Sequence, residues 1–313
     1  MRIVITGAAG FVGRALIERL ARGHSIVAVD FDTNALARHA GIERVDGDLG
    51  AAAVRRRALA QGCDALVHLA TVPGGAAEAD PVASRRINID AMYDLLEDAR
   101  AASAAPVRVV YASSIAVFGD PLPPDGVTDD TPVAPRLVYG GHKAMMEVAV
   151  AMMSHRGEID GVTVRLPGIL ARPSGVSGMK SAFMSDLFHA LRAGRPFTCP
   201  VSPGATIWAE SVTCCAQNLH HALTLDPGSL PRTRAVTLPA LRVRMDALAL
   251  EIARQCGADI GLVRYAPEPA LEAAFGAHPP LLTPNAERAG FVSDGDVATL
   301  VARALDRIGA DAQ

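Results

Sequence analysis

Short apolar runs rich in β-branched residues alternate with helix-period segments through the first half of the chain. The segments with helical spacing cover residues 11–22, 51–60, 84–103 and 138–155, and the apolar runs cover residues 3–5, 26–29, 65–69, 107–111 and 162–166. Continuous apolar strands separated by helices indicate a parallel sheet that is covered on both faces. Because the crossovers of such sheets are right-handed, we predict an α/β fold with a doubly wound parallel sheet.

The pattern changes after residue 166. Proline and glycine become frequent, and predicted helices near 179–193, 211–225 and 243–256 are separated by short strand candidates. We therefore expect residues 1–166 to form the doubly wound domain and residues 167–313 to form mainly a smaller α+β lobe. Residues 120–135 hold five of the 21 prolines and predict a long loop, which in a compact domain is usually functional or mobile.

Composition and charge narrow the class of protein. Of 313 residues, 50% are hydrophobic and 20% are charged, which is typical of a globular chain and excludes disorder. The net charge of −3 favours neither nucleic acid nor an anionic membrane as a partner. Five scattered cysteines show no zinc-ligand spacing, and no run reaches the ~18 apolar residues of a membrane span. We expect a cytoplasmic protein without a metal site.

The first predicted strand runs into a glycine-rich turn, Thr6-Gly7-Ala8-Ala9-Gly10-Phe11-Val12-Gly13. The first N–H groups of the following helix lack partners, so the pyrophosphate of a dinucleotide can bind there. Gly7 permits the tight turn, Gly10 the approach of the phosphates, and Gly13 the close packing of helix on strand. A glycine-rich turn that binds nothing is the alternative. The position of the turn between a buried strand and a helix favours the cofactor, with Phe11 and Val12 in its binding turn.

The second predicted strand ends at Asp30, whose carboxylate can accept both hydroxyls of an adenosine ribose and would repel a 2′-phosphate. No Arg or Lys lies between His24 and Arg38 to neutralise such a phosphate, so NAD is favoured over NADP. Asp48 and Leu49 follow a further short strand. Asp48 is a candidate partner of the adenine amine, and a loop acid is an equal alternative.

Tyr139 and Lys143 lie one turn apart on a predicted helix and so share a face. A lysine ammonium beside a tyrosine stabilises the phenolate and draws its pKa of ~10 toward neutrality. The pair is therefore a candidate general acid/base for an alcohol–ketone interconversion. Only two of the 30 basic residues are lysines, which makes a chance Tyr-x-x-x-Lys improbable in this chain.

Two serines, Ser113 and Ser114, end a predicted strand in the segment Tyr111-Ala112-Ser113-Ser114-Ile115-Ala116-Val117-Phe118-Gly119. A serine at the carboxyl end of a strand faces the crevice where doubly wound sheets bind ligands. Its hydroxyl can orient a substrate oxygen toward Tyr139. A turn in which the serine hydroxyls only cap the strand is the alternative.

Taken together, TGAAGFVG, Asp30, HLA at 68–70, SSIAVFG and YGGHK resemble the extended short-chain dehydrogenases/reductases, the NAD-dependent epimerase/dehydratase family. The resemblance covers nearly the whole chain. It implies an NAD-binding Rossmann domain over residues 1–166, with some later segments returning to its sheet. It also implies a catalytic triad of Ser114, Tyr139 and Lys143, and a nicotinamide side lined by Leu69, Ala70, Asn88 and the backbone around Pro167.

Most extended members act on nucleotide sugars and hold the diphosphate with an Asn and an Arg-Asp pair. Here Gly168 stands in place of the Asn, and Ala205-Thr206 in place of the pair. A buried diphosphate without cationic partners is strongly disfavoured. The segments SSIAVFG, Arg165-Leu166-Pro167, Cys199-Pro200-Val201 and Trp208 instead resemble the D-erythronate dehydrogenase branch, which oxidises the 2-hydroxyl of a small sugar acid.

That branch carries arginines around the Trp, whereas this chain has Thr206 before it and Glu210-Ser211-Val212 after it. The candidates for a carboxylate anchor are Arg172, Lys180 and Arg136, each of which also reads as a surface charge. We expect Arg172, Trp208, Ser113 and Ser114 to contact the substrate. The alternatives are a nucleotide-sugar epimerase or dehydratase, and a non-catalytic dinucleotide-sensing protein that uses the fold to bind a partner.

The predicted helix over 138–155 carries two further expectations. Helical spacing turns His142 about 100° from Lys143, so we expect it to face solvent. The stretch from Ala144 to Met153 is apolar except for Glu147, which fits the homodimer contact that family members often make through this helix. His220-His221 is read as helix packing rather than a metal site.

Overall fold

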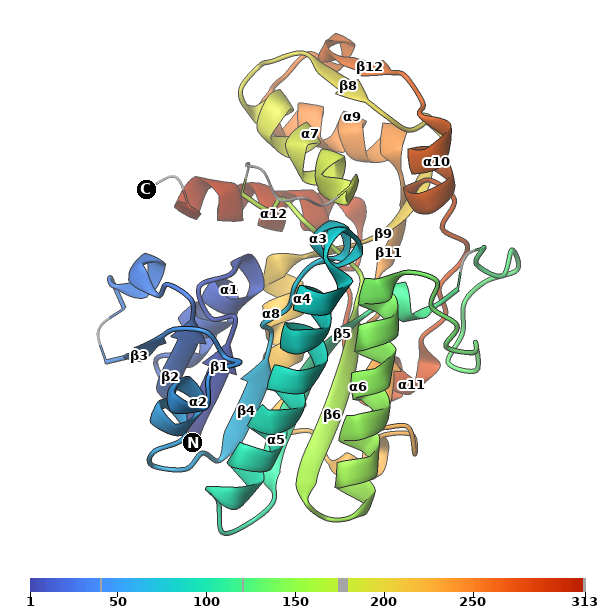
Figure 1. The fold of residues 1–313 in the computed structure, drawn as a ribbon. Helices are drawn as coiled ribbons and strands as arrows, with labels where there is room; N and C mark the ends of the chain where they lie inside the picture. Colours follow the sequence, from blue (N-terminus) through green and yellow to red (C-terminus); the bar gives the residue numbers. More distant parts are fainter. Residues whose placement is uncertain (40, 120, 174–179, 312–313) are drawn as a thin grey trace.

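The computed structural model describes residues 1–39, 41–119, 121–173 and 180–311. Its centre is a seven-stranded parallel sheet in the order β10-β6-β5-β4-β1-β2-β3. The strands are β1 (Arg2–Thr6), β2 (Ser25–Asp30), β3 (Glu43–Asp46), β4 (Ala65–His68), β5 (Val107–Ser114), β6 (Ile159–Leu166) and β10 (Ala235–Thr237). The predicted doubly wound sheet is confirmed, and Figure 1 shows helices on both of its faces.

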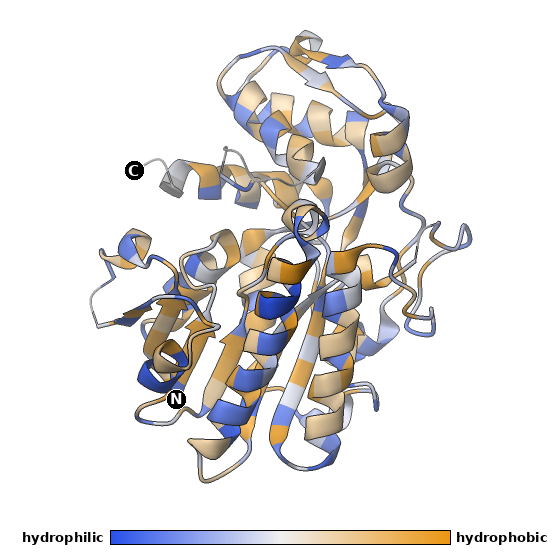
Figure 2. Cartoon of the chain, viewed as in Figure 1, coloured by the Kyte–Doolittle hydropathy of each residue, from blue (hydrophilic) through white to orange (hydrophobic). Residues whose placement is uncertain are grey.

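Alternate residues of each strand enter two separate cores, one on each face of the sheet. Ile3 and Ile5 of β1 pack into one core and Val4 packs into the other, all with no exposed surface. Figure 2 accordingly shows apolar colour along the strands and bands of hydrophilic colour on the helices over residues 81–101 that cover one face. A sheet that is buried on both faces requires such continuous apolar runs, which is why they predicted the sheet correctly.

The helices of the first half follow the predicted segments, except for the helix over residues 74–79, which no predicted segment covers. Those of the first half are α1 (Phe11–Leu20), α2 (Ala52–Ala58), α3 (Gly74–Ala79), α4 (Pro81–Arg85), α5 (Met92–Ala101) and α6 (Val138–His155). A single wide turn, η2 (Arg86–Ala91), joins α4 to α5, and a short 3₁₀ turn, η3 (Ile115–Val117), follows β5. The remaining short turns are η1 (Asn34–Leu36), η4 (Lys180–Ala182), η5 (Pro227–Ser229) and η6 (Ile260–Leu262).

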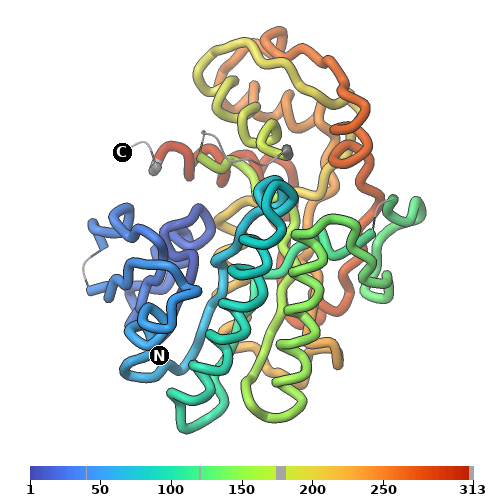
Figure 3. Tube along the Cα trace, in the orientation of Figure 1, coloured from blue at the N-terminus to red at the C-terminus, as the bar shows by residue number. Residues whose placement is uncertain are grey.

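The later part of the chain forms a lobe with its own core. The lobe holds a three-stranded sheet of β11 (Leu241–Arg244), β9 (Thr206–Ser211) and β7 (Gly168–Leu170), and a pair of β12 (Val263–Tyr265) with β8 (Phe197–Cys199). Its helices are α7 (Phe183–Arg192), α9 (Met245–Cys256), α10 (Pro269–Phe275) and α12 (Val297–Asp311). Figures 1 and 3 place β8, β12, α7 and α9 beyond the carboxyl ends of the central strands.

Some later segments return to the central sheet, as the family resemblance implied. Strand β10 pairs with β6, with Val236 opposite Val164. Helix α8 (Val212–Ala222) and the short helix α11 (Pro284–Arg288) contribute Leu219 and Ala286 to the core beneath α1. The division at residue 166 is therefore one of sequence position, while the central core draws on both halves of the chain.

The proline-rich loop is fastened to the rest of the molecule through its described part. Val127 is fully buried, and its N–H donates to the carbonyl of Pro280 at 2.8 Å. A further bridge joins Phe118 to Val133 across the loop.

Among the described residues, no helix is both long enough and apolar enough to cross a membrane.

Candidate active site

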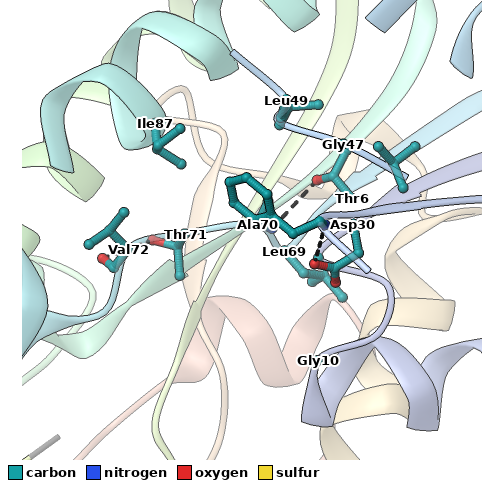
Figure 4. Close-up of a pocket in the computed structure, with 13 residues that line it drawn as sticks. Thr6, Gly10, Asp30, Gly47, Leu49, Leu69, Ala70, Thr71, Val72 and Ile87 are labelled. Carbon is teal, nitrogen blue, oxygen red and sulfur yellow. Dashed lines mark hydrogen bonds between the residues drawn. The ribbon is translucent and has the colours of Figure 1, made fainter. Parts of the chain in front are cut away.

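A cavity of about 280 Å³ lies at the carboxyl ends of β1, β2 and β4. Figure 4 shows Asp30 and Thr6 close to the start of α1, with Thr71, Val72 and Ile87 on the other side. The predicted binding residues Gly7, Gly10, Asp30, Leu49, Leu69 and Ala70 all line this cavity. Parallel strands that end at one edge bring these segments together from distant parts of the sequence.

The glycine loop is shaped so that side chains would fill it. Gly7 has a φ of 66°, and a Cβ there would lie 2.6 Å from the nitrogen of Ala70. A Cβ on Gly13 would lie 2.4 Å from the carbonyl oxygen of Gly7. Both distances are impossible for real atoms, so glycine is required for the loop to close on the strand. Next to this loop, the N–H groups of Phe11, Val12 and Gly13 in the first turn of α1 have no acceptor within the helix.

Asp30 is held at the rim of this loop. Its two carboxylate oxygens accept hydrogen bonds from the N–H of Ala9 at 2.9 Å and of Phe31 at 2.8 Å. These bonds fix the carboxylate beside the turn where a dinucleotide ribose would lie. The glycine cradle and this carboxylate together fit an adenine dinucleotide.

Asp48 lies next to the cavity rather than in its lining. Its carboxylate accepts a hydrogen bond from the N–H of Gly50 at 2.8 Å and forms an ion pair with Arg86 at 2.7 Å. Arg86 is largely exposed, so the pair is weak and can exchange its partner. The contact of Asp48 with adenine stays a prediction.

Asn88 organises the loop that follows β4. Its side-chain oxygen accepts from the N–H of Val72 at 2.7 Å, and its amide donates to the carbonyl of the same residue at 3.0 Å. The amide also donates to the hydroxyl of Ser84, which lies 3.0 Å from a ring nitrogen of His142. Asn88 is 3% exposed and shapes the part of the cavity that Val72 lines, while its contact with nicotinamide stays a prediction.

The prediction that His142 faces solvent is wrong. His142 is buried and bonded to Ser84 of α4, because α3 and α4 pack against the start of α6 and cover that side of it. Burial is also the main cause that lowers the pKa of His142. Helical spacing alone could not reveal that α3 and α4 cover this side of α6.

The predicted triad residues come together where α6 begins. The N–H of Val138 at the helix start donates to the carboxylate of Glu78 at 2.6 Å, an acid supplied by α3. The ammonium of Lys143 lies 5.6 Å from the centre of the Tyr139 ring and donates to the carbonyl of Ala112 at 2.7 Å. The hydroxyl of Ser114 is a hydrogen-bond partner of Tyr139. It also accepts from the N–H of Ala116 at 3.1 Å, which caps η3.

The balance of pKa shifts differs from the sequence expectation. Burial raises the pKa of Tyr139, while the charge of Arg172 and the hydrogen bond with Ser114 lower it. Burial also lowers the pKa of Lys143 to about 7, against a smaller opposing effect of Glu147. The lysine is therefore only partly an ammonium at neutral pH. The charge of Arg172 and the hydrogen bond with Ser114 both favour the phenolate form of Tyr139. Spacing along the sequence did not reveal either effect.

Two residues that were predicted to contact the substrate are buried and have hydrogen-bond partners within the protein. Ser113 is buried and its hydroxyl donates to the carboxylate of Glu147 at 2.5 Å, because neighbouring residues of a strand point to opposite faces. Trp208 is 1% exposed, and its ring N–H donates to the carbonyl of Pro279 at 2.7 Å. It packs with Val117 and so supports the turn after β5, and its contact with the substrate stays a prediction.

Arg172 is the candidate carboxylate anchor that the fold brings to the site. Its charge acts on the pKa of Tyr139, and its guanidinium donates to the carbonyl of Ile169 at 3.2 Å. The preceding Ala171 has a left-handed φ of 60°, and the N–H of Arg172 donates to the hydroxyl of Ser185 at 3.1 Å. A strained backbone held by its surroundings is typical of functional sites. The side chain of Lys180 lies outside the described residues.

The cavity also contains residues that the sequence analysis missed. They are Thr6, Val29, Phe31, Gly47, Thr71, Val72 and Ile87. Phe31 is 67% exposed, although it lines the cavity directly after Asp30. The sequence does contain a signal for Phe31, because an aromatic residue directly follows the acid that was predicted to bind ribose.

Pro167 lies between β6 and β7 at the same edge, because Leu166 pairs with Ser114 in the sheet. Its backbone is thus next to the predicted triad, and its contact with nicotinamide stays a prediction.

Comparison with known proteins places this site in context. Residues 3–203 match the family described as "NAD dependent epimerase/dehydratase family". The D-erythronate dehydrogenase of Cupriavidus necator is 33% identical over 99% of both chains, and that of Haemophilus influenzae is 29% identical over 82% of this chain and 83% of the relative. The solved nucleoside-diphosphate-sugar epimerase of Agrobacterium tumefaciens superposes with a TM-score of 0.87 at 28% identity, covering 96% of this chain and 92% of that one.

Proposed function

Because the chain belongs to the NAD dependent epimerase/dehydratase family, we propose that it is an NAD-dependent dehydrogenase that oxidises a secondary hydroxyl of a small sugar acid, a 2-hydroxy acid such as D-erythronate. The observation that carries this proposal is the meeting of Ser114, Tyr139 and Lys143 with Arg172. An acid/base pair beside a cation suits an alcohol that carries a carboxylate. The full-length similarity to the Cupriavidus necator enzyme supports the same substrate class.

Each residue of this group has a distinct task in the proposed reaction. Ser114 and Tyr139 hold the substrate hydroxyl, and the Tyr139 phenolate accepts its proton. Lys143 stabilises that phenolate and is expected to reach the nicotinamide ribose. Bound NAD would accept the hydride that leaves the substrate carbon. Arg172 holds the carboxylate with a planar, bidentate guanidinium.

We expect NAD rather than NADP as the cofactor. The carboxylate of Asp30 is fixed by the N–H groups of Ala9 and Phe31, so it cannot easily move away from a 2′-phosphate. A fixed anion at this position repels a second anion and accepts ribose hydroxyls.

A nucleotide-sugar epimerase is the second candidate, favoured by the similarity to the Agrobacterium tumefaciens structure. The site supports it less well. A Cβ on Gly168 would lie 2.8 Å from the carbonyl oxygen of Trp208, so the Asn that the resemblance expects there would require β9 to move. Ala205, at the position of the Arg-Asp pair, is buried and supplies no charge.

The deciding experiment incubates the protein with NAD and a panel of small sugar acids and follows NADH by its absorbance. Accumulation of NADH with a sugar acid supports the dehydrogenase, whereas conversion of a nucleotide sugar without net NADH supports the epimerase. NAD binding without turnover of either class would favour the third alternative, a dinucleotide-sensing protein.

The acid/base assignment has a matched control on the chain. Tyr139→Phe should keep NAD affinity and retain less than about a tenth of the turnover, because only the transferable proton is lost. Tyr93→Phe, on α5 away from the site, should behave as the unmodified protein. Lys143→Met should reduce both turnover and NAD affinity. Activity of Tyr139→Phe close to that of Tyr93→Phe would show that the base is another group.

We further propose that the protein is a homodimer that pairs through α6. Met145, Val148 and Met152 are 51%, 69% and 38% exposed and follow one another at helical spacing on its outer face. Burial of such a stripe against its copy would remove apolar surface from water. Sedimentation of the protein and of Val148→Glu measures this, and a monomer for both would refute it.

A further inference from the structure

A register between α6 and the end of β5 underlies the proposed site. Three residues of α6, at positions 139, 143 and 147, lie one turn apart on one face, and each contacts a different residue of the tripeptide 112–114. The contacts are Tyr139 with the Ser114 hydroxyl, Lys143 with the Ala112 carbonyl, and Glu147 with the Ser113 hydroxyl.

Of these three contacts, the one made by Glu147 has the most hydrogen bonds. Glu147 is 6% exposed, and Arg165 of β6 is 7% exposed. The guanidinium of Arg165 donates to both carboxylate oxygens, at 3.0 and 2.7 Å, in a bidentate ion pair. Arg165 is the sheet partner of Ser113 and also lies 5.2 Å from the Phe118 ring. The carboxylate thus connects α6, β5 and β6 below the reacting groups.

The surroundings of Lys143 contain few charges that could hold its ammonium. Tyr111 of β5 presents its ring at 4.9 Å, and burial raises the pKa of its hydroxyl well above the usual value. Burial also lowers the pKa of His68 of β4 to about 3, so this neighbour is neutral. Tyr139 is the remaining titratable neighbour, and Arg172 faces Tyr139 rather than the lysine. Glu147, paired with Arg165, supplies the negative charge that opposes the desolvation of Lys143.

We propose that Glu147, held by Arg165 and Ser113, is a positioning residue that fixes the register of α6 on β5 and holds a negative charge one helical turn from the amine of Lys143. The assignment of Tyr139 and Lys143 to the reaction rests on the proposed function above. The role of Glu147 in the ionisation of Lys143 does not depend on which substrate is used.

The chain allows a direct measurement, because it contains only two lysines, Lys143 and Lys180. Protein labelled with ¹³C at the lysine ε-carbon gives two NMR signals, and Lys180→Arg assigns them. The titration of the Lys143 signal is then compared between the unmodified protein, Ser113→Ala and the double variant Glu147→Gln/Arg165→Met. The double variant removes both charges and keeps the site filled, so no unpaired charge is left in the core.

We expect the pKa of Lys143 in the double variant to fall by at least about half a unit, because the charge of the Glu147 carboxylate is lost while burial remains. Its kcat should fall by about tenfold or more, since a misplaced acid/base pair slows the chemical step. Ser113→Ala leaves both charges in place and should leave the Lys143 titration nearly unchanged, with a smaller loss of kcat because one bond to the carboxylate is lost. Glu97→Gln, an exposed acid on α5, is the control and should leave both quantities unchanged.

The outcomes separate this proposal from the one on which it rests. An unchanged Lys143 titration in a double variant that merely melts earlier would overturn the proposal and leave Glu147 a structural residue. A shifted titration supports it even if no sugar acid is turned over, in which case the proposed function fails by itself. If the double variant does not fold, Glu147→Asp, which keeps the charge but shortens the side chain, should preserve the pKa of Lys143 and lower kcat, and an unchanged kcat would refute the positioning role.

Discussion

Two adjacent glycines, Gly140 and Gly141, follow the proposed base and should respond in opposite ways to the same substitution. A Cβ on Gly140 would lie 2.1 Å from the carbonyl oxygen of Ala116 in η3 and 3.1 Å from the Cβ of Pro135. A Cβ on Gly141 would meet no atom within 4 Å. Alanine at position 140 therefore has to push α6 and η3 apart, whereas alanine at 141 only lengthens a side chain into open space.

The size of each effect follows from these distances. An ordinary contact needs about 1 Å more than the Gly140 geometry offers, so α6 must shift by roughly that amount in a close-packed interior. Overpacking of this kind costs about 1–3 kcal/mol of unfolding free energy, partly offset by ~0.5–1 kcal/mol from replacing a helical glycine. Gly141→Ala receives the second contribution without the first and should be stabilised by ~0.5–1 kcal/mol.

The larger consequence of Gly140→Ala concerns the chemistry. Ser114 caps η3 and contacts Tyr139, so a shift between η3 and α6 separates the two hydroxyls. A misplacement of about 1 Å at reacting groups can cost around 100-fold in rate. We therefore expect Gly140→Ala to lose about 100-fold in kcat and much less in NAD affinity, because α6 is expected to contribute only Tyr139 and Lys143 to cofactor binding while the glycine loop is unchanged.

Thermal unfolding, NAD titration and steady-state turnover of the two variants test this reasoning. Gly141→Ala should melt at or above the temperature of the unmodified protein and keep its turnover. Equal turnover and equal stability in the two variants would refute the geometry of the α6–η3 contact. An unchanged kcat in a destabilised Gly140→Ala variant would show that this contact does not set the position of Ser114 relative to Tyr139.

Four further outcomes can be stated briefly. Asp30→Ala should narrow the difference between NAD and NADP affinity, and equal affinities in the unmodified protein would contradict the role of Asp30. Phe31→Ala should weaken binding of AMP and NAD but not of nicotinamide mononucleotide, because the exposed ring lies at the Asp30 end of the cavity; equal loss for all three ligands would argue against an adenine contact. Burial raises the pKa of Glu210 from 4.5 to about 8. Its protonated form therefore stabilises the fold fully below pH 4.5, and the free energy of unfolding falls by roughly 1.4 kcal/mol per pH unit as the pH rises from 4.5 to 8. Glu210→Gln should remove that loss in melts between pH 6 and 9, with exposed Glu97→Gln as a control that keeps it. A UDP-sugar should give no thermal shift with NAD present, whereas a small sugar acid should give one that weakens on esterification; the reverse pattern would favour the epimerase.

Much of the fold could be predicted from local patterns. The sheet of β1, β2, β4, β5 and β6 followed from apolar runs, since a strand covered on both faces has to be apolar at every position. The glycine loop, Asp30 and the Tyr139–Lys143 pair were found by spacing, because a phosphate-binding turn and a helical pair depend on residues close together in sequence. The placement of Gly7, Gly10 and Asp30 around one cavity agrees with those predictions.

The sequence by itself therefore determined most strands of the central sheet, the helices α1, α2, α5 and α6, and the short motifs that are candidates for chemistry, whereas α3 and α12 were not predicted. The tertiary structure alone decided which side chains those motifs present. Ser113 and Ser114 are chemically identical, and the alternation of side chains along β5 together with the position of α6 directs one to Glu147 and the other to Tyr139. His142 was predicted to face solvent and Trp208 to contact the substrate, but α4 and the segment around Pro279 bury them. In each case the deciding neighbour comes from a distant part of the chain, and no local pattern encodes a surface that exists only after packing.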